Sequence, residues 1–311
     1  MVGRVRRVRS ARTAPIVDEP FPGFADVIDF GAGRDFAARE LGTNRAVRLR
    51  RISADLLATR SPAELERELS TLAAISAHPN VVTLYRSFRA PDGSTVLVLE
   101  PATGPLAARP AGSVEAAVAT AVAVAGALET AHRAGVLHGA VSPETVLITR
   151  FGAPVVGGFG LAGAGDSGTA PPDGHTAPEV LEGASLSPAT DVYGLASTLY
   201  HLLVGAPPFD GRPEESAAAL SLRILRDPVP ALTSARVPVE LADIVLGALA
   251  KDATQRPASA AALAAELAVV EQAQGWPLTP LVVGSVTAPP RRPAPGPGAS
   301  ARPRPVSPGV A

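Results

Sequence analysis

Few residues in this 311-residue chain can carry acid–base or covalent chemistry. Cysteine is absent, which excludes disulfides, thiolate metal sites and cysteine nucleophiles together. Lysine occurs once, at Lys251, so a mechanism that needs a lysine has one candidate. For Gly31 and Gly33, the residues alone favour an ordinary hairpin bend.

The elements that must position these residues fall into two halves. From Phe24 to about Glu100, short β-type runs dominate, at 45–49, 81–88 and 95–100. One helix is expected over 61–77, because Ser61 supplies an N-cap and Pro62 and Glu64 complete a helix start. From Ser113 onward the pattern is mainly helical, with expected helices at 113–134, 191–204, 241–250 and 259–270, and two short strands at 145–149 and 153–156. The sequence therefore predicts a two-lobed α+β fold.

Composition and charge narrow the function classes. Hydrophobic residues make up 46% of the chain, which is typical of a globular protein. The net charge is -1, which argues against a nucleic-acid binder. The apolar run 116–128 is too short to cross a bilayer and is expected to be a buried helix. A cytoplasmic protein without a membrane span is therefore expected.

Both ends of the chain differ from its middle. Residues 1–23 carry five arginines and are expected to form a basic flexible arm. Residues 273–311 are rich in proline and arginine, contain no acid, and are expected to form a disordered tail. Trp276 and the apolar residues after it are the part of the tail that could pack back on the body.

The order of short motifs resembles that of bacterial eukaryotic-like Ser/Thr protein kinase domains over residues 24–272. The matching motifs are Gly31-Ala-Gly33, Arg45-Ala-Val-Arg48, Glu68, His78-Pro-Asn80, Leu97-Val-Leu-Glu100, His138-Gly-Ala140, Gly158-Phe-Gly160, Ala177-Pro-Glu179, Asp191-Val-Tyr193, Gly205-Ala-Pro-Pro-Phe209 and Lys251-Asp with Gln255-Arg256-Pro257. Each motif is weak alone, but their order is specific. The resemblance implies a protein-kinase-like fold with a small β-rich N-lobe with one main helix (24–100) and a large α-helical C-lobe (105–272).

The resemblance also implies that the catalytic positions are degenerate. Ala140 stands at the catalytic aspartate, Thr145 at the metal-binding asparagine and Gly158 at the metal-binding aspartate. Arg48 replaces the lysine that contacts ATP. Phe36 replaces the third loop glycine, where we expect its ring to obstruct a phosphate. The implied domain lacks the base and both protein ligands of Mg²⁺.

Residues that match the structural positions of the family are retained. Glu179 and Arg256 match its buried ion pair, and Asp191 matches the aspartate that steadies the turn at His138. The family stacks an apolar spine between its lobes, and the matching positions are Leu72, Leu84, His138 and Phe159. Retained structure beside lost chemistry is the pattern of a pseudokinase.

A vestigial nucleotide site remains a candidate at Gly31, Gly33, Arg48 and Glu68. We expect Arg48 and Glu68 to form a structural ion pair, with an adapted nucleotide contact as the alternative. No cofactor and no metal site are expected, and weak binding of ATP without Mg²⁺ is left open. Replacement Mg²⁺ ligands at Asp166 and Asp173 are the less favoured alternative.

Two histidines are expected to have no catalytic role. His138 is expected to be a packed core histidine rather than a general base, because its partner position is Ala140. His175 is expected to be solvated.

Candidate phospho-acceptors in the segment that matches the activation loop are Ser167, Thr169 and Thr176.

The function expected from the resemblance is a catalytically impaired kinase-like domain that serves as a regulatory or scaffolding module in Ser/Thr phosphorylation signalling. The expected partner is a protein: a kinase, a phosphothreonine-reading domain, or a groove-binding domain that takes the proline-rich tail. One alternative is a divergent but active ATP-dependent Ser/Thr kinase. The other is an interaction protein that works mainly through Pro-x-x-Pro segments of its tail, such as 290–293.

Overall fold

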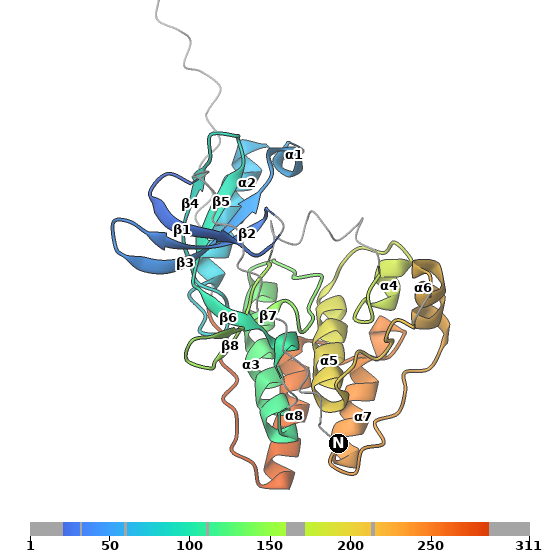
Figure 1. Cartoon of the computed structure of the whole chain (residues 1–311). Helices are drawn as coiled ribbons and strands as arrows, with labels where there is room; N and C mark the ends of the chain where they lie inside the picture. Colours follow the sequence, from blue (N-terminus) through green and yellow to red (C-terminus); the bar gives the residue numbers. More distant parts are fainter. Residues whose placement is uncertain are drawn as a thin grey trace, which may run out of the picture.

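A five-stranded antiparallel sheet forms one lobe of the molecule, and a helical bundle forms the other (Figure 1). The computed structural model describes residues 21–31, 33–58, 61–109, 112–159, 172–212 and 215–285. Among these residues the predicted two-lobed α+β arrangement is confirmed.

The sheet of the small lobe has the order β1-β2-β3-β5-β4. Its strands are β1 (Phe24–Asp29), β2 (Asp35–Glu40), β3 (Arg45–Ile52), β4 (Leu84–Arg89) and β5 (Thr95–Leu99). Side chains alternate between the two faces of a strand. Phe36 and its partner Leu49 therefore face one side and join an aromatic core, whereas Arg48, opposite Ala37 and Leu99, faces the other side.

One long helix, α2 (Pro62–Ile75), packs on this sheet after the short α1 (Ala54–Leu57). The Ser61 side chain accepts from the backbone of Glu64, and the Glu64 carboxylate accepts from the backbone of Ser61. This reciprocal cap is the one that the sequence predicts, and it fixes where the helix begins. Leu65 and Ile75 are its buried residues.

The large lobe is built mainly from helices. These are α3 (Val114–Arg133), α4 (Pro178–Leu181), α5 (Pro188–Val204), α6 (Ala217–Arg226), α7 (Val239–Ala248) and α8 (Ala260–Gln274), with the 3-10 turns η1 (Leu106–Ala108) and η3 (Ala253–Gln255). A three-stranded sheet, β6 (Ala102–Pro105), β7 (Val146–Thr149) and β8 (Pro154–Val156), joins this bundle to the small lobe.

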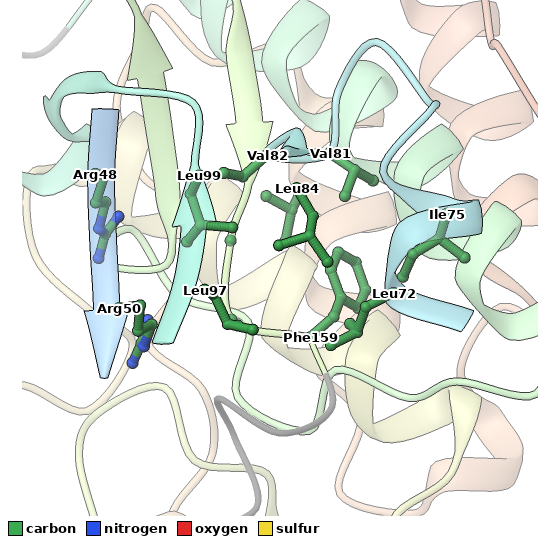
Figure 2. A pocket seen from close by; sticks show the side chains of 13 residues that line it. Arg48, Arg50, Leu72, Ile75, Val81, Val82, Leu84, Leu97, Leu99 and Phe159 are labelled. Carbon is green, nitrogen blue, oxygen red and sulfur yellow. The ribbon is translucent and has the colours of Figure 1, made fainter. Parts of the chain in front are cut away.

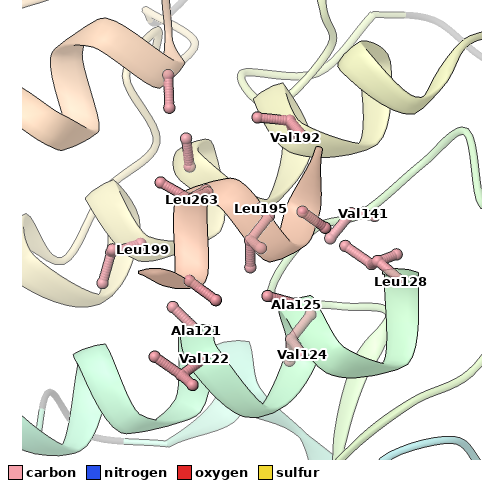
Figure 3. Close-up of a cluster of buried hydrophobic side chains, with 14 of the residues drawn as sticks. Ala121, Val122, Val124, Ala125, Leu128, Val141, Val192, Leu195, Leu199 and Leu263 are labelled. Atoms are coloured by element: carbon pink, nitrogen blue, oxygen red, sulfur yellow. The ribbon is translucent and has the colours of Figure 1, made fainter. Parts of the chain in front are cut away.

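The core of the large lobe lies where α3, α5 and α8 meet (Figure 3). Ala121 and Ala125 of α3 are small enough to let Leu195 of α5 and Leu263 of α8 approach closely. By length and composition alone α3 could cross a membrane, but 61% of its apolar window is buried inside the fold. Its apolar character is therefore explained by its central position.

The folded part extends beyond both predicted domain limits. Phe21, which the sequence analysis assigns to the N-terminal arm, is buried against Phe36 with a ring separation of 4.9 Å. Residues 276–285, assigned to the tail, pack on the body after α8. The remainder of the predicted arm and tail, 1–20 and 286–311, lies outside the described residues.

Candidate functional site

The space between the lobes holds a small apolar cavity (Figure 2). Its volume is about 40 Å³, which is room for a few water molecules. Typical ligand pockets have volumes of about 300–1,000 Å³. Arg48 and Arg50 of β3 line one end, and Leu72, Leu84 and Phe159 line the other. The cavity is therefore smaller than a typical ligand pocket, and most of the side chains that line it are apolar.

The residues expected to form a spine between the lobes do meet. In Figure 2, Leu72 of α2 and Leu84 of β4 lie against the ring of Phe159. Phe159 in turn contacts the His138 ring edge-on, with centroids 4.9 Å apart. These four side chains connect the small lobe to the centre of the large lobe, as predicted.

The turn at His138 is held by one buried carboxylate. Asp191 accepts from the backbone N–H groups of His138 at 2.9 Å and of Gly139 at 2.7 Å. His132 Nε2 lies 2.7 Å from the same carboxylate. The predicted steadying role of Asp191 is confirmed, and it explains why a residue with almost no exposed surface carries a carboxylate.

His138 is a packed core residue, as expected. Its Nε2 lies 3.0 Å from the carbonyl oxygen of Gly157, and its Nδ1 accepts from the backbone of Ala140. Burial lowers the pKa of His138, so its ring stays neutral near pH 7. Both ring nitrogens are engaged with backbone groups, which fits a positioning residue rather than a base.

Glu179 and Arg256 form the predicted buried ion pair. The Arg256 guanidinium donates to both carboxylate oxygens, each at 2.8 Å, and its side chain is completely buried. Arg256 also donates to three backbone carbonyl groups, those of Ala250, Ala189 and Lys251. The pair joins α4 to the segment before α8, and a bidentate geometry of this kind is strong.

At the three positions that the family resemblance matches to catalytic and metal-binding residues, the side chains are small or bond locally. Ala140 is exposed and ends in a methyl group. The Thr145 hydroxyl bonds to backbone groups of Ala140 and Ser142 and therefore closes its own loop. Gly158 has a φ of +98°, a conformation that residues with a side chain rarely adopt, although a Cβ there would meet His138 Nε2 only at an ordinary 3.7 Å. The backbone frame is intact, but these side chains offer no base and no carboxylate.

The backbone donors of the glycine loop are already occupied. Asp29 accepts from the N–H groups of Gly31 at 2.9 Å and Gly33 at 2.7 Å. A phosphate group bound in a glycine-rich loop would use such N–H groups. Asp29 therefore occupies both of these N–H groups, and sequence reasoning missed it, although an aspartate two residues before a glycine is a common turn signal.

The expected obstruction by Phe36 is wrong. Phe36 is 3% exposed and packs with Phe21 and Phe24 on the face of the sheet that points away from the cleft. Because Phe36 lies opposite Leu49 in the β2–β3 ladder, its direction is fixed by strand alternation. The ring stabilises the small lobe and leaves the cleft free.

The expected ion pair between Arg48 and Glu68 is also wrong. Arg48 Nε donates to Asp35 Oδ1 at 2.9 Å, and its Nη2 lies 2.8 Å from the same oxygen. Asp35 lies on the same face of neighbouring β2, two residues before Ala37, which is directly opposite Arg48. The ladder therefore brings this diagonal pair together. Glu68 lies on α2.

The loop before α4 holds a compact polar cluster. His175 Nδ1 lies 2.8 Å from Ser197 Oγ, and its ring stacks on His201 at 5.4 Å. Burial lowers the pKa of His175 to about 4. The expectation that His175 is solvated is therefore wrong, because α5 supplies both Ser197 and His201 beneath it.

The candidate phospho-acceptors and replacement metal ligands are only partly described. Ser167, Thr169 and Asp166 lie outside the described residues. Thr176 is partly buried and donates to Asp173, which also accepts from the backbone of His175. Among the described residues, no three histidine, aspartate or glutamate side chains gather closely enough to hold a metal ion.

A two-lobed fold, an inter-lobe spine and a buried Glu–Arg anchor together define a protein kinase fold. The sequence matches the protein kinase domain family over residues 30–267, and the chain belongs to that family.

Several bacterial Ser/Thr kinases are similar to this chain. Serine/threonine-protein kinase PknK of Mycobacterium bovis is 33% identical over 279 residues, which cover 84% of this chain and 24% of the relative. PknB of Mycolicibacterium smegmatis is 32% identical over 278 residues, covering 80% and 43%. The kinase pkn3 of Myxococcus xanthus is 30% identical over 267 residues, covering 78% and 48%. The chain spans less than half the length of each of these relatives.

Proposed function

We propose that this chain is a catalytically impaired kinase domain, a pseudokinase, that regulates or scaffolds Ser/Thr phosphorylation signalling through a protein partner. One observation carries the proposal. The polar groups that hold the kinase framework, such as Asp191 and Arg256, keep their partners, whereas Ala140, Thr145 and Gly158 stand where the family carries out chemistry. We also propose that the protein lies in the cytoplasm. Fractionation of cells would test this localisation.

The chemical reason follows from what phosphoryl transfer requires. The reaction needs a carboxylate that accepts the hydroxyl proton and oxygen ligands that hold Mg²⁺ against the phosphates. A methyl group at Ala140 and a hydrogen at Gly158 supply neither. If ATP binds, Arg48 and Arg50 are the cationic groups beside the cleft that would contact it. Mg²⁺ would gain no protein ligand from Thr145, whose hydroxyl is engaged.

The direct test is thermal unfolding with ATP, with and without Mg²⁺. A ligand present at 100 times its Kd stabilises a protein by about 2.7 kcal/mol, so real binding is visible in Tm. We expect a small shift or none with ATP, and no increase when Mg²⁺ is added. A clear Mg²⁺-dependent increase would contradict the proposal, because it requires a metal site of a different kind.

A repair experiment tests whether only the chemistry is missing. The set is Arg48→Lys, Ala140→Asp, Thr145→Asn and Gly158→Asp, and Phe36 stays because its ring belongs to the core. Catalytic groups act as a unit, so single changes should give nothing while the set gives measurable autophosphorylation. The control is the same set without Ala140→Asp. Activity in the unmodified chain, lost in Arg48→Ala, would instead support the divergent active kinase.

The partner is part of the proposal and is a kinase, a phosphothreonine-reading domain or a groove-binding domain. If the proline-rich tail dominates binding, removing residues 286–311 abolishes capture of the partner while the kinase fold remains. The cut belongs after Ser285, because residues 276–285 pack on the body. If capture survives the cut, the kinase-like body is the binding module.

A further inference from the structure

The chain after α8 forms a strap over residues 276–285 that runs back alongside α3 toward the small lobe (Figure 1). Near its start, Thr279 donates to the carboxylate of Glu271 through its N–H at 2.9 Å and through its hydroxyl at 2.6 Å. Near its end, the Gly284 N–H donates to Thr130 Oγ1 at 2.9 Å. Glu271 and Thr130 are each 1% exposed, so the strap supplies donors to two buried polar side chains.

The strap also contacts the link that joins α2 to β4, residues 76–83. His78 Nδ1 accepts from the backbone N–H of Asn80 at 3.0 Å, so the ring carries a proton on Nε2. Nε2 donates to the carbonyl oxygen of Val282 in the strap at 2.8 Å. Because His78 is only 5% exposed, its ring is held both by the backbone of the link and by the strap.

The same link has a second attachment to the large lobe, through β8. The Val156 N–H donates to the carbonyl oxygen of Asn80 at 2.8 Å, and the Val82 N–H donates to the carbonyl oxygen of Val156 at 3.0 Å. The link continues directly from α2, whose Leu72 and Ile75 line the cavity between the lobes. A change at the strap can therefore reach α2 through the link.

Little apolar surface holds the strap in place. Trp276, at its start, packs against the core of the large lobe. The apolar side chains that follow, Leu278, Leu281 and Val282, are 63%, 37% and 41% exposed. The strap is therefore attached mainly by the hydrogen bonds described above. A segment with few buried apolar contacts opens more readily than the core of a fold.

We propose that residues 276–285 are a detachable brace that holds the α2–β4 link on the large lobe, and that release of the brace frees the end of α2. Gly126 of α3 supports this role, because a Cβ there would collide with the carbonyl oxygen of Val282. Glycine is a poor helix former, so α3 carries a residue that weakens the helix and makes room for the strap. The brace acts through contacts outside the cleft, so the inference goes beyond the proposed function and does not depend on it.

The substitution Gly126→Ala in the full chain tests the brace without weakening the helix beneath it. Alanine favours a helix over glycine, whereas its methyl group displaces the backbone of the strap at Val282. Gly247→Ala is the matched control, because Gly247 lies in α7 and a Cβ there would meet no described atom within 4 Å. Hydrogen–deuterium exchange measured by mass spectrometry follows the strap, the link and, as a reference, the buried helix α5.

We expect both the strap and residues 76–83 to exchange at least about tenfold faster in Gly126→Ala than in the unmodified chain, with no change in α5. Gly247→Ala should leave all three regions unchanged. Faster exchange in the strap alone would overturn the proposal, because the link would then be held without the strap.

A second variant, Thr279→Pro, removes both donors to Glu271 and leaves α3 as it is. We expect the same faster exchange in the strap and the link. If Gly126→Ala also speeds exchange in α5, the whole fold has been weakened, and the result for Thr279→Pro decides. If neither variant speeds exchange in the strap, the strap is a fixed part of the large lobe and the proposal is wrong.

Discussion

The turn at His138 and the glycine loop are built alike, since in each a single carboxylate accepts two backbone N–H groups. Asp191 does so in the buried framework of the large lobe, with 1% of its surface exposed. Asp29 does so at the rim of the cleft and is only partly buried. The same motif therefore stabilises two different turns: the buried turn at His138 in the large lobe, and the partly exposed turn at Gly31 and Gly33 in the small lobe.

The contrast extends to the ion pairs. Arg256 is completely buried and its partner Glu179 is 15% exposed, whereas Arg48 and Asp35 are 15% and 13% exposed, so the two pairs differ in their arginines and not in their carboxylates. A completely buried guanidinium without its carboxylate is uncompensated, whereas water can reach one that is partly exposed. Framework residues are costly to change, and rim residues are open to substitution.

The largest expected effect is that of Arg256→Ala. Removing one partner of a buried pair costs about 3–5 kcal/mol, because Glu179 is left without its guanidinium. In a domain of this size that lowers Tm by roughly 10 °C. The control is Arg133→Ala, which removes a 59% exposed guanidinium from Glu129, a residue that also accepts from the backbone of Ala261, and should cost less than about 1 kcal/mol. If calorimetry gave both variants the same Tm, the buried ion pair would contribute no more to stability than the pair of Arg133, which would contradict the prediction.

A matched pair of substitutions tests the two carboxylates directly. Asp191→Asn replaces an acceptor of two N–H groups by an amide and should cost about 2–3 kcal/mol in urea unfolding. Asp29→Asn makes the same change at the rim and should cost about 0.5 kcal/mol or less. The comparison fails if Asp29→Asn is as damaging as Asp191→Asn.

Acid should weaken the large lobe through His175. Burial lowers the pKa of His175 to about 4, with Asp173 opposing this shift and His201 adding to it. Between pH 6.5 and 4 the unfolded chain therefore binds a proton that the folded chain does not, so stability falls as pH falls. His175→Gln should therefore make Tm depend less steeply on pH. Some dependence should remain, because burial also lowers the pKa of His138. An unchanged slope would show that His175 is accessible to solvent.

The smallest effect concerns the rim pair. A double-mutant cycle with Arg48→Met and Asp35→Asn should give a coupling of about 1 kcal/mol. The parallel cycle with Arg48→Met and Glu68→Gln should give a coupling near zero. A coupling between Arg48 and Glu68, with none between Arg48 and Asp35, would instead support the ion pair that the family resemblance implies.

Short sequence motifs predict the contacts of the buried framework well and the contacts of Arg48 poorly. The cap at Ser61, the Glu179–Arg256 pair and the Asp191 contact were predictable, because each depends on a short motif or on a position that the fold preserves. The partner of Arg48 was not predictable, because it depends on the register of β2 and β3, and the sequence analysis predicted no strand at 35–40.

Phe36 and the strap show what motif matching leaves out. Matching Phe36 to a loop glycine says nothing about the face on which its ring lies, and alternation along β2 decides that. The sequence analysis assigns residues 276–285 to the tail, and the apolar residues from Trp276 onward are the signal that part of it could pack on the body. Their contacts with His78, Gly126 and Thr130 are long-range, and these partners leave no local pattern in the sequence.

The contact between His78 and Val282 also has a consequence for synthesis. Its two ends are 204 residues apart, so the contact cannot form until nearly all of the folded region has left the ribosome. At roughly 5–20 residues per second, that is about 10–40 s after His78 is made. During this interval the face of α3 at Gly126 has no strap, and the nascent domain is open there to chaperones or to a neighbouring chain on the same messenger RNA.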